Sequence, residues 1–113
     1  MALLTAITTP TATGAAYTTQ AVSASDTIPA SAFGPTGCLL FVINGGGSPD
    51  TVGVVDGSSS PSGNLGQTLT NSVTNGTTEV MFIPRSTINA ATQVTTITHT
   101  FTTSVTCAVV VQV

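Results

Sequence analysis

The residues able to do acid–base chemistry are few in this chain. His99 is the only histidine, and the carboxylates are Asp26, Asp50, Asp56 and Glu79. A histidine base needs an orienting carboxylate and a nucleophile within hydrogen-bond reach, and the spacing of these residues indicates no such group. Aspartates at turns and strand ends usually accept hydrogen bonds from backbone N–H groups. We therefore expect no catalytic site and no enzymatic activity.

Other patterns that carry chemistry are also missing their partners. His99 alternates with Thr95, Ile97 and Phe101, which predicts a half-buried, hydrogen-bonded histidine on a strand face. The glycine run at 44–47 is followed by neither a lysine nor a helix, so it does not resemble a phosphate-binding loop. We expect no cofactor and no metal.

The two cysteines, Cys38 and Cys107, both lie within apolar, strand-like segments. One interpretation is two small buried side chains, because free cysteine is among the most buried residue types. The other is a disulfide across neighbouring strands, which requires Cα atoms within about 7 Å. Both alternatives stay open at this point, whereas a metal site lacks further ligands.

Arg85 is the only cation and directly follows Pro84. It has two interpretations. Within the chain it would pair with Glu79 or with loop carbonyls. Between chains its planar guanidinium would clamp a carboxylate of another subunit with a defined geometry.

The near-absence of charge excludes several classes of partner. One arginine and four carboxylates make 4% of the chain, against about 25% in ordinary soluble domains. Nucleic acid and anionic membranes are excluded because both require many lysines and arginines. No segment approaches the 18 or so apolar residues of a membrane span, and residues 1–10 lack the basic start of a signal peptide. So little charge favours a subunit covered by neighbours over a free monomer.

The pattern of short apolar runs predicts an all-β fold. Threonine and serine make up roughly a third of the chain, and threonine, valine and isoleucine favour strands. We predict an antiparallel β-sandwich or jelly-roll-like fold of seven to eight short strands and no helix beyond one turn within 85–91. The expected strands are 17–22, 27–33, 38–43, 51–56, 65–73, 78–83, 93–101 and 105–113.

Three pairs of consecutive strands are expected to form hairpins. The first spans residues 38–56 across a glycine-rich loop. The second turns at Asn75-Gly76, the strongest short hairpin motif in the chain. The third closes the domain, with residues 102–104 joining 93–101 to 105–113. Residues 23–26 are expected to form a turn, and Pro29 argues against a central strand beside it.

The last expected strand has an alternating pattern. Odd positions from Val105 to Val113, including Cys107, are apolar and predict one buried face. The opposite face includes Val110 and Gln112. Because the chain carries so little charge, we expect these two residues to be covered as well, by the second sheet or by a neighbouring subunit.

The N-terminal residues suggest a second element beside the sandwich. We divide the chain into an extended arm, residues 1–15, and a single β-sandwich domain, residues 16–113. Leu3, Leu4 and Ile7 are too apolar to remain in water, so they are candidate contacts with another subunit. The alternatives are an edge strand and a loosely ordered terminus. Arg85, Val110 and Gln112 complete the set of candidate subunit or capsid contacts.

The order of these segments resembles small structural proteins of tailed bacteriophage particles. The resemblance covers most of the chain, and the motifs that carry it are Leu3-Leu-Thr-Ala-Ile-Thr-Thr-Pro10, Ser25-Asp-Thr-Ile-Pro29, Leu39-Leu-Phe-Val-Ile-Asn44, Thr51-Val-Gly-Val-Val-Asp56, Thr77-Thr-Glu-Val-Met-Phe-Ile-Pro84, Val94-Thr-Thr-Ile-Thr98 and Val105 to Val113. Two cysteines and unusually few charges depart from that pattern.

The resemblance implies a role in a virion. Such proteins are commonly β-sandwich decoration or cement proteins on the capsid exterior, often homotrimeric, whose partners are the major capsid protein and copies of themselves. We therefore expect a capsid protein that bridges and stabilises capsid subunits. The alternatives are a tail or fibre component and a carbohydrate-binding module, although sugar stacking needs more exposed aromatic rings than this chain offers.

Overall fold

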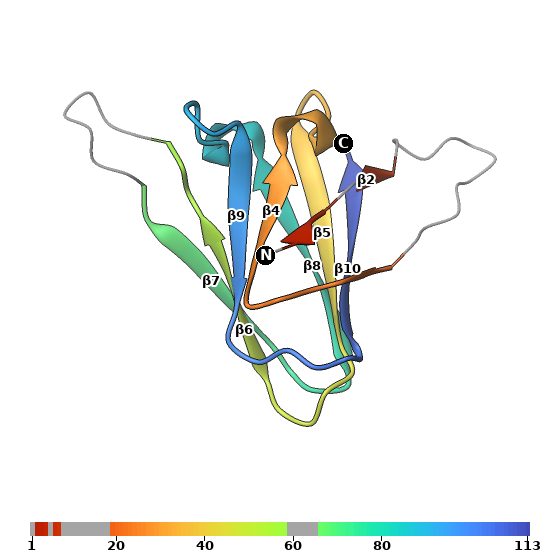
Figure 1. The fold of residues 1–113 in the computed structure, drawn as a ribbon. Helices are drawn as coiled ribbons and strands as arrows, with labels where there is room; N and C mark the ends of the chain where they lie inside the picture. The colour runs from red at the N-terminus through yellow and green to blue at the C-terminus, as the bar shows by residue number, and fades with distance from the viewer. Residues whose placement is uncertain (1, 5, 8–18, 59–65) are drawn as a thin grey trace.

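The chain folds as two β-sheets packed face to face in a computed structural model (Figure 1). The structure is described for residues 2–4, 6–7, 19–58 and 66–113. Within these ranges the only helical elements are the short 3₁₀ turns η1 (Ala30–Ala32) and η2 (Arg85–Thr87). The predicted all-β sandwich is confirmed, and so is the single turn expected within 85–91.

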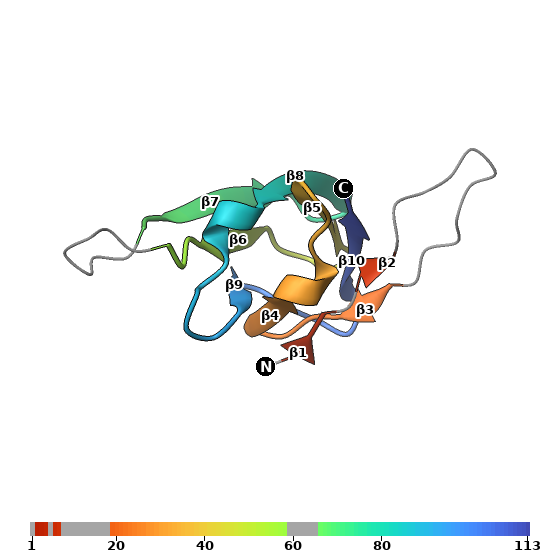
Figure 2. The ribbon, with the colours of Figure 1, turned by 90° about the horizontal axis from the view of Figure 1, so that it is seen from above.

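Each sheet combines long strands with short N-terminal ones. Sheet A has the order β1-β4-β9-β6-β7 and sheet B the order β2-β10-β5-β8, with β3 also paired to β10. Figure 2, seen from above, shows the two layers and places β1 beside β4 and β2 beside β10. The strands are β1 (Ala2–Leu3), β2 (Ala6–Ile7), β3 (Gln20–Ala21), β4 (Ser25–Pro29), β5 (Gly37–Asn44), β6 (Asp50–Val55), β7 (Thr68–Val73), β8 (Thr77–Pro84), β9 (Val94–His99) and β10 (Thr106–Gln112).

The core lies between the sheets and follows the alternation of the strands. In β5, Cys38, Leu40 and Val42 point inward and are fully buried. They face apolar side chains of sheet A, among them Val52 and Ile97. Successive side chains of a strand point to opposite faces, so every second residue of β5 is left on the outside of sheet B.

The three expected hairpins are wrong, because each of these pairs of strands is divided between the two sheets. β5 and β8 belong to sheet B, whereas β6 and β7 belong to sheet A, and β9 and β10 are divided in the same way. The glycine φ of +78° at Gly76 does produce a turn, but its N–H donates to the Asn44 carbonyl, 2.7 Å away. The turn therefore connects the two layers instead of pairing its own flanking strands.

Asn44 explains locally why these connections cross. Its buried Nδ2 donates to the carbonyl oxygens of Ser48, 2.9 Å away, and Val73, 3.0 Å away. Its Oδ1 accepts the N–H of Gly46 at 3.0 Å. One side chain thus joins the end of β5 to the end of β7, which fixes both inter-layer loops at this end of the sandwich.

β10 alternates as predicted, but the face that enters the core is the other one. The core contains Ala108 and Val110, whereas Val105 is 54% exposed. Val110 and Gln112 lie on the inward face. Of the two covers expected for them, the second sheet and a neighbouring subunit, the second sheet covers Val110. Val109 and Val111, on the face predicted to be buried, are 4% and 8% exposed, so both faces of β10 are largely covered. Only the side that enters the core was misassigned, because the inward face begins with the polar Thr106.

β4 corrects a second expectation. Residues 23–26 were expected to form a turn, yet β4 begins at Ser25 and pairs with both β1 and β9. Asp26 is fully buried within it. The expectation that Pro29 prevents a central strand was wrong, since β4 lies between β1 and β9. Pro29 is tolerated because it is the last residue of β4, beyond the two residues that pair with β1.

Candidate protein-binding surface

The outer face of sheet B is almost entirely apolar. Rows of side chains cross β8, β5 and β10, because residues paired in a sheet point to the same face. All of the residues in these rows except Thr78 are apolar, and the rows are Phe82–Leu39–Val111, Val80–Phe41–Val109 and Thr78–Ile43–Cys107. We call this set of residues the outer face.

The outer face is bulkier than the inner face of the same strands. Leu39, Phe41 and Ile43 of β5 point outward and are half-buried, whereas the inward positions include Cys38 and Asn44. In β8, Val80 and Phe82 point outward and are 54% and 55% exposed. Val109 and Val111 of β10 are only 4% and 8% exposed, so the accessible part of the outer face lies on β8 and β5. Exposed apolar patches on soluble proteins mark sites of interaction.

Every charged side chain lies elsewhere. The five charged residues, one arginine and four carboxylates, are all within the described ranges, and none occupies a position in the rows of the outer face. Glu79 points inward from β8 and accepts a hydrogen bond from Asn71 Nδ2 at 3.2 Å. An apolar partner can therefore approach the outer face without desolvating a charge.

Arg85 binds carbonyls of its own chain. Its Nη1 atom donates to the carbonyl oxygens of Gly34, 3.1 Å away, and Phe33, 3.3 Å away. Of the two interpretations of Arg85, the structure shows the one with loop carbonyls. Its proposed clamp on another chain stays a prediction.

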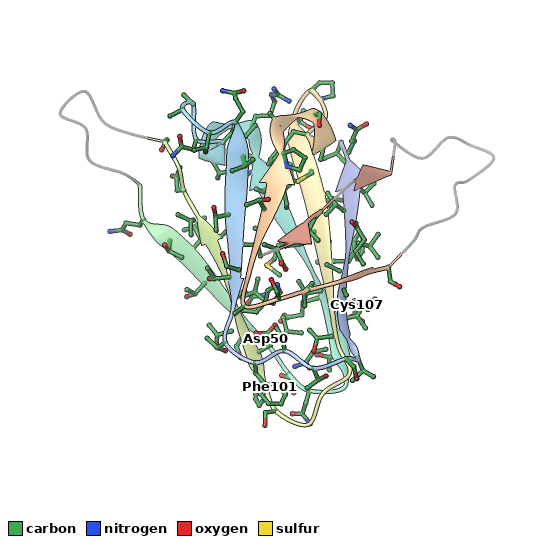
Figure 3. All side chains as sticks on the ribbon, in the orientation of Figure 1. Asp50, Phe101 and Cys107 are labelled. Carbon is green, nitrogen blue, oxygen red and sulfur yellow. The ribbon has the colours of Figure 1, made fainter. Side chains whose placement is uncertain are left out.

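A buried polar cluster at one end of the core is the feature that the sequence did not indicate. His99 Nδ1 lies 2.6 Å from Asp50 Oδ2, and His99 Nε2 lies 3.8 Å from Asp26 Oδ2. The side chains come from β9, β6 and β4, and His99 is only 6% exposed. Figure 3 labels Asp50 and Phe101, which lie at the lower end of the sandwich in that view.

Backbone and hydroxyl donors satisfy both carboxylates of this cluster. Asp50 Oδ1 accepts the N–H groups of Thr100 and Phe101 at 2.9 and 3.2 Å. Asp26 accepts the N–H and the hydroxyl of Ser23, the latter at 2.5 Å. Three residues far apart in the sequence meet here, and only the pairing of β4 and β6 with β9 brings them together.

The arrangement of the cluster favours a structural role. The Ser23 hydroxyl is bonded to Asp26, and His99 Nε2 has no hydrogen-bond partner in the described part of the chain. A catalytic histidine needs a nucleophile or a substrate proton at that nitrogen, and here both flanking carboxylates are fully buried. Asp50 links β6 to the end of β9 and to the loop that follows it, while Asp26 of β4 lies 3.8 Å from the other ring nitrogen of His99.

The candidate contact residues at the N-terminus lie against their own chain. The backbones of Leu3 and Ile7 pair with β4 and β10. Leu4 is 1% exposed and belongs to the core. In this structure Leu4 therefore stabilises its own sandwich and has no surface free for a second subunit.

Two further candidates are also engaged within the chain. Val110 is buried in the core, and Gln112 Nε2 donates to the carbonyl of Ser31 at 2.9 Å. Their role as contacts with another subunit stays a prediction. The apolar residues that remain accessible on sheet B, above all Val80 and Phe82, were missed because they were assigned only to a strand and not to a face.

The two cysteines are free, which corrects the possible disulfide. Cys38 points into the core, whereas Cys107 belongs to the outer face (labelled in Figure 3). Cys107 pairs with Ile43, five residues along β5 from Cys38, a spacing of roughly 16 Å in a strand. This exceeds the reach of a disulfide. Burial raises the pKa of the Cys38 thiol to about 12.

Comparisons with known proteins give no match, whether with family models, with curated proteins or with solved structures. In the ranges that the structure describes, no helix has the length and apolar character needed to cross a membrane. The same ranges contain no group of three or more histidine, cysteine or acidic side chains arranged to hold a metal ion.

Proposed function

We propose that this chain is a non-enzymatic structural protein of a virion that decorates a bacteriophage capsid and cements its subunits. The observation that carries the proposal is the charge-free apolar outer face of sheet B. The assignment to a virion is based on the resemblance to small phage structural proteins, given by segments such as Leu39 to Asn44 and Thr77 to Pro84. In this proposal the major capsid protein covers the outer face, and the protein acts as a homotrimer on the capsid exterior.

The physical basis of cementing is burial of apolar area without ionic contacts. Each square ångström of apolar surface removed from water contributes about 25 cal/mol. Contacts made by valine, leucine and phenylalanine are insensitive to salt, whereas exposed ion pairs are screened. A shell stabilised in this way would keep its strength across a wide range of ionic strengths.

The test uses particles stripped of this protein and then reconstituted with purified variants. Phe41→Lys places a charge in the middle of the outer face. Thr96→Lys is the matched control, because Thr96 is also half-buried but lies in β9 of sheet A. We expect wild-type protein and Thr96→Lys to restore heat resistance of the particles, and Phe41→Lys to bind at least tenfold more weakly.

Three results would overturn the proposal. Stripped particles that resist heat as well as complete ones would exclude cementing. Equal binding of Phe41→Lys and Thr96→Lys, with both variants folded by circular dichroism, would exclude the outer face as the contact. Absence of the protein from purified particles by mass spectrometry would exclude the virion assignment.

A further inference from the structure

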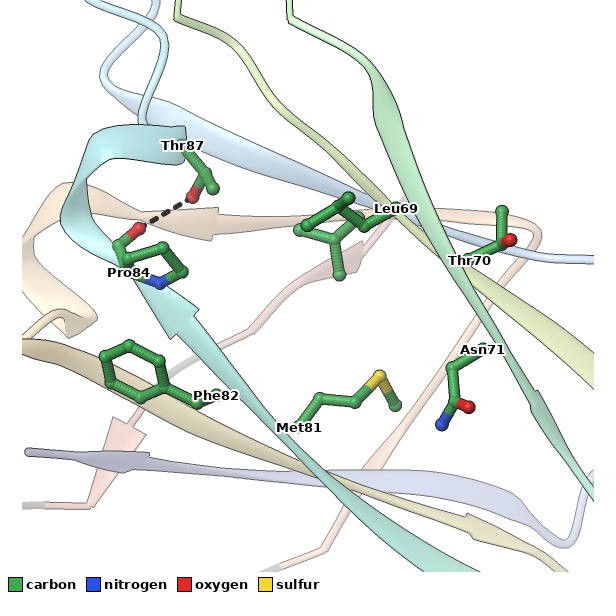
Figure 4. A pocket seen from close by; sticks show the side chains of 8 residues that line it. Leu69, Thr70, Asn71, Met81, Phe82, Pro84 and Thr87 are labelled. Carbon is green, nitrogen blue, oxygen red and sulfur yellow. Dashed lines mark hydrogen bonds between the residues drawn. The ribbon is translucent and has the colours of Figure 1, made fainter.

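A groove separates the edge strands of the two sheets. β7 and β8 are neighbours in the sequence, but one ends sheet A and the other ends sheet B. Figure 4 shows the two strands diverging, with Leu69, Thr70 and Asn71 on one side and Met81, Phe82 and Pro84 on the other. Val54 and Thr87 complete the lining, and the groove has a volume of about 230 Å³.

Within the described ranges, the backbone of β8 has N–H and C=O groups without a partner strand along this groove. Gly37 and Val113 exchange both N–H···O bonds, so the odd residues of β5 bond to β10 and its even residues bond to β8. In β8 the N–H and C=O groups of Val80 and Phe82 therefore point away from β5. Pro84 is an even-numbered residue like Val80 and Phe82, so its nitrogen also points away from β5. This agrees with the rule that proline in a sheet occupies the unpaired side of an edge strand.

β7 presents a similar edge on the other side. The N–H of His99 donates to the carbonyl of Ala24, which makes the odd residues of β9 face β4 and its even residues face β6. The odd residues of β6 therefore bond to β9 and its even residues bond to the odd residues of β7. The backbone groups of Thr70 and Ser72, which are even residues of β7, point away from β6. Among the residues that the structure describes, both walls of the groove thus have backbone donors and acceptors without a partner strand.

The narrow end of the groove is closed and the wide end is apolar. The hydrogen bond from Asn71 Nδ2 to Glu79 Oε2, 3.2 Å, ties β7 to β8. Beyond it the walls carry Met81 and Phe82 opposite Leu69, which is 59% exposed. Apart from the Asn71 amide and the threonine hydroxyls, the side chains along the walls are apolar.

We propose that this groove binds an extended, apolar segment of another protein, which adds a strand to the free edge of β8. Unpaired strand edges are templates for such addition. The segment's inward side chains would pack on Leu69 and Met81. The inference does not depend on the virion assignment, and it concerns the backbone edge of Val80 and Phe82, whose side chains belong to the outer face.

The dimensions and composition of the groove favour a strand over a small ligand. Pockets for drug-sized molecules typically measure about 300–1,000 Å³ and include placed polar side chains. This groove is smaller, at about 230 Å³, and its unpaired hydrogen-bonding groups are backbone groups spaced as in a sheet. A partner therefore has to supply backbone hydrogen bonds and alternating apolar side chains together.

A different protein is the better donor than a second copy of the chain. Every strand in the described ranges already pairs within its own sandwich. Leu4, between β1 and β2, is also buried in the core. To insert a strand between β7 and β8, a second copy would have to release that strand at the cost of its own core. Direct pairing of two free β8 edges needs no such release and is the competing outcome that is tested below.

The probe for the test is a capped peptide of alternating valine and threonine, eight residues long, with one lysine at each end for solubility. A peptide of the same composition in which every second amide is N-methylated is the control, because it cannot pair with an edge. Binding is followed by calorimetry, and amide exchange of the protein is followed by NMR. We expect the first peptide to slow exchange at Val80 and Phe82 at least tenfold and the methylated peptide to have no effect.

Matched variants separate the backbone from the side chain. Val80→Pro removes an unpaired N–H and leaves the bonds between β8 and β5 intact, whereas Val80→Ala shortens the side chain and keeps the N–H. We expect Val80→Pro to abolish peptide binding and Val80→Ala to weaken it by less than about fivefold. Leu69→Lys, which places a charge in the groove without altering β8, should also abolish binding and provides the test if Val80→Pro does not fold.

Three outcomes would overturn the proposal. The first is the absence of protection at millimolar peptide with the wild-type protein. The second is equal binding of the methylated peptide. The third is protection of Val80 and Phe82 that rises with protein concentration in the absence of peptide, which would assign the edge to a second copy.

Discussion

The Nδ1 atom of His99 lies 2.6 Å from the Oδ2 atom of Asp50, although the two residues are separated by 49 positions in the chain. The contact joins the end of β9 to the start of β6, inside the same sheet. Asp50 also accepts the backbone N–H groups of Thr100 and Phe101. One buried carboxylate therefore holds both a side chain and the first residues of the loop that leads to sheet B.

Removal of that carboxylate should destabilise the fold strongly. Asp50→Ala leaves the His99 ring nitrogen and two backbone N–H groups without their acceptor, and each unsatisfied buried group costs about 1–3 kcal/mol. We expect the free energy of unfolding to fall by at least about 3 kcal/mol. Urea denaturation followed by circular dichroism measures it.

The matched control is Asp56→Ala. Asp56 accepts one exposed hydrogen bond, from the N–H of Ser58, so its loss should cost no more than about 1 kcal/mol. Similar effects of the two substitutions would show that the buried cluster contributes little to stability.

The cysteines should differ in reactivity. The thiolate is the reactive form, and burial raises the pKa of Cys38 to about 12, whereas Cys107 is half-buried on the outer face. At pH 8 a maleimide should label Cys107 in the folded protein and leave Cys38 unmodified until urea unfolds the chain. Labelling is read by mass spectrometry with the variants Cys107→Ser and Cys38→Ser. Equal labelling of both thiols without urea would contradict the structure.

Cys38 should also make the fold sensitive to alkaline pH. In the unfolded chain the thiol ionises near its ordinary pKa of 9.0, whereas in the folded chain burial raises that pKa to about 12. Between these values the unfolded state binds fewer protons, so stability falls as pH rises, by at most about 1.4 kcal/mol per pH unit. Below pH 9 this contribution is fully present. Cys38→Ala should remove this part of the slope when melting temperatures are compared between about pH 8 and pH 11.

Substitution by alanine should destabilise the fold at Gly37 and have little effect at Gly47. Gly37 has a φ of +150°, and a Cβ there would lie 2.3 Å from the carbonyl oxygen of Ile83. Gly37→Ala should cost at least about 2 kcal/mol, from backbone strain and displacement of β8. Gly47 has open space around it, so Gly47→Ala should stay within about 0.5 kcal/mol of the wild type. Thermal unfolding of the two variants side by side tests this contrast.

Amide exchange should alternate along β8 in the free protein. Met81 and Ile83 donate toward β5, whereas Val80 and Phe82 point away from it. We expect the latter two amides to exchange at least a hundredfold faster than the former. Uniform protection along β8 in NMR-detected exchange would mean that the edge is already covered.

The fold class was accessible from the sequence, and its connectivity was not. Alternation and strand propensity act locally, so the run from Cys38 to Ile43 and the segment before Pro84 were both located correctly. Whether consecutive strands share a sheet depends on contacts such as that of Asn44 with Val73, which join residues distant in sequence. Asn75-Gly76 does form a turn, but a turn motif does not specify which layer receives the next strand.

The functional features were accessible only in part. The scarcity of charge led to the expectation of a subunit covered by neighbours, which stays a prediction, and the side of β10 that faces the core was misassigned. Both faces of β10 and β5 are apolar, so hydrophobicity could not distinguish the core from the outer face. The meeting of Asp26, Asp50 and His99 depends on strand pairing, which no spacing in the sequence indicates.

The position of β10 has a consequence for how the protein is made. Of the strands in this sandwich it leaves the ribosome last, yet it lies inside sheet B, between β5 and the short strands β2 and β3. Until it arrives, β5 lacks one neighbour and the N-terminal residues of sheet B have no strand to pair with. Folding of sheet B therefore has to be completed after β10 has emerged, whereas all five strands of sheet A precede β10 in the chain.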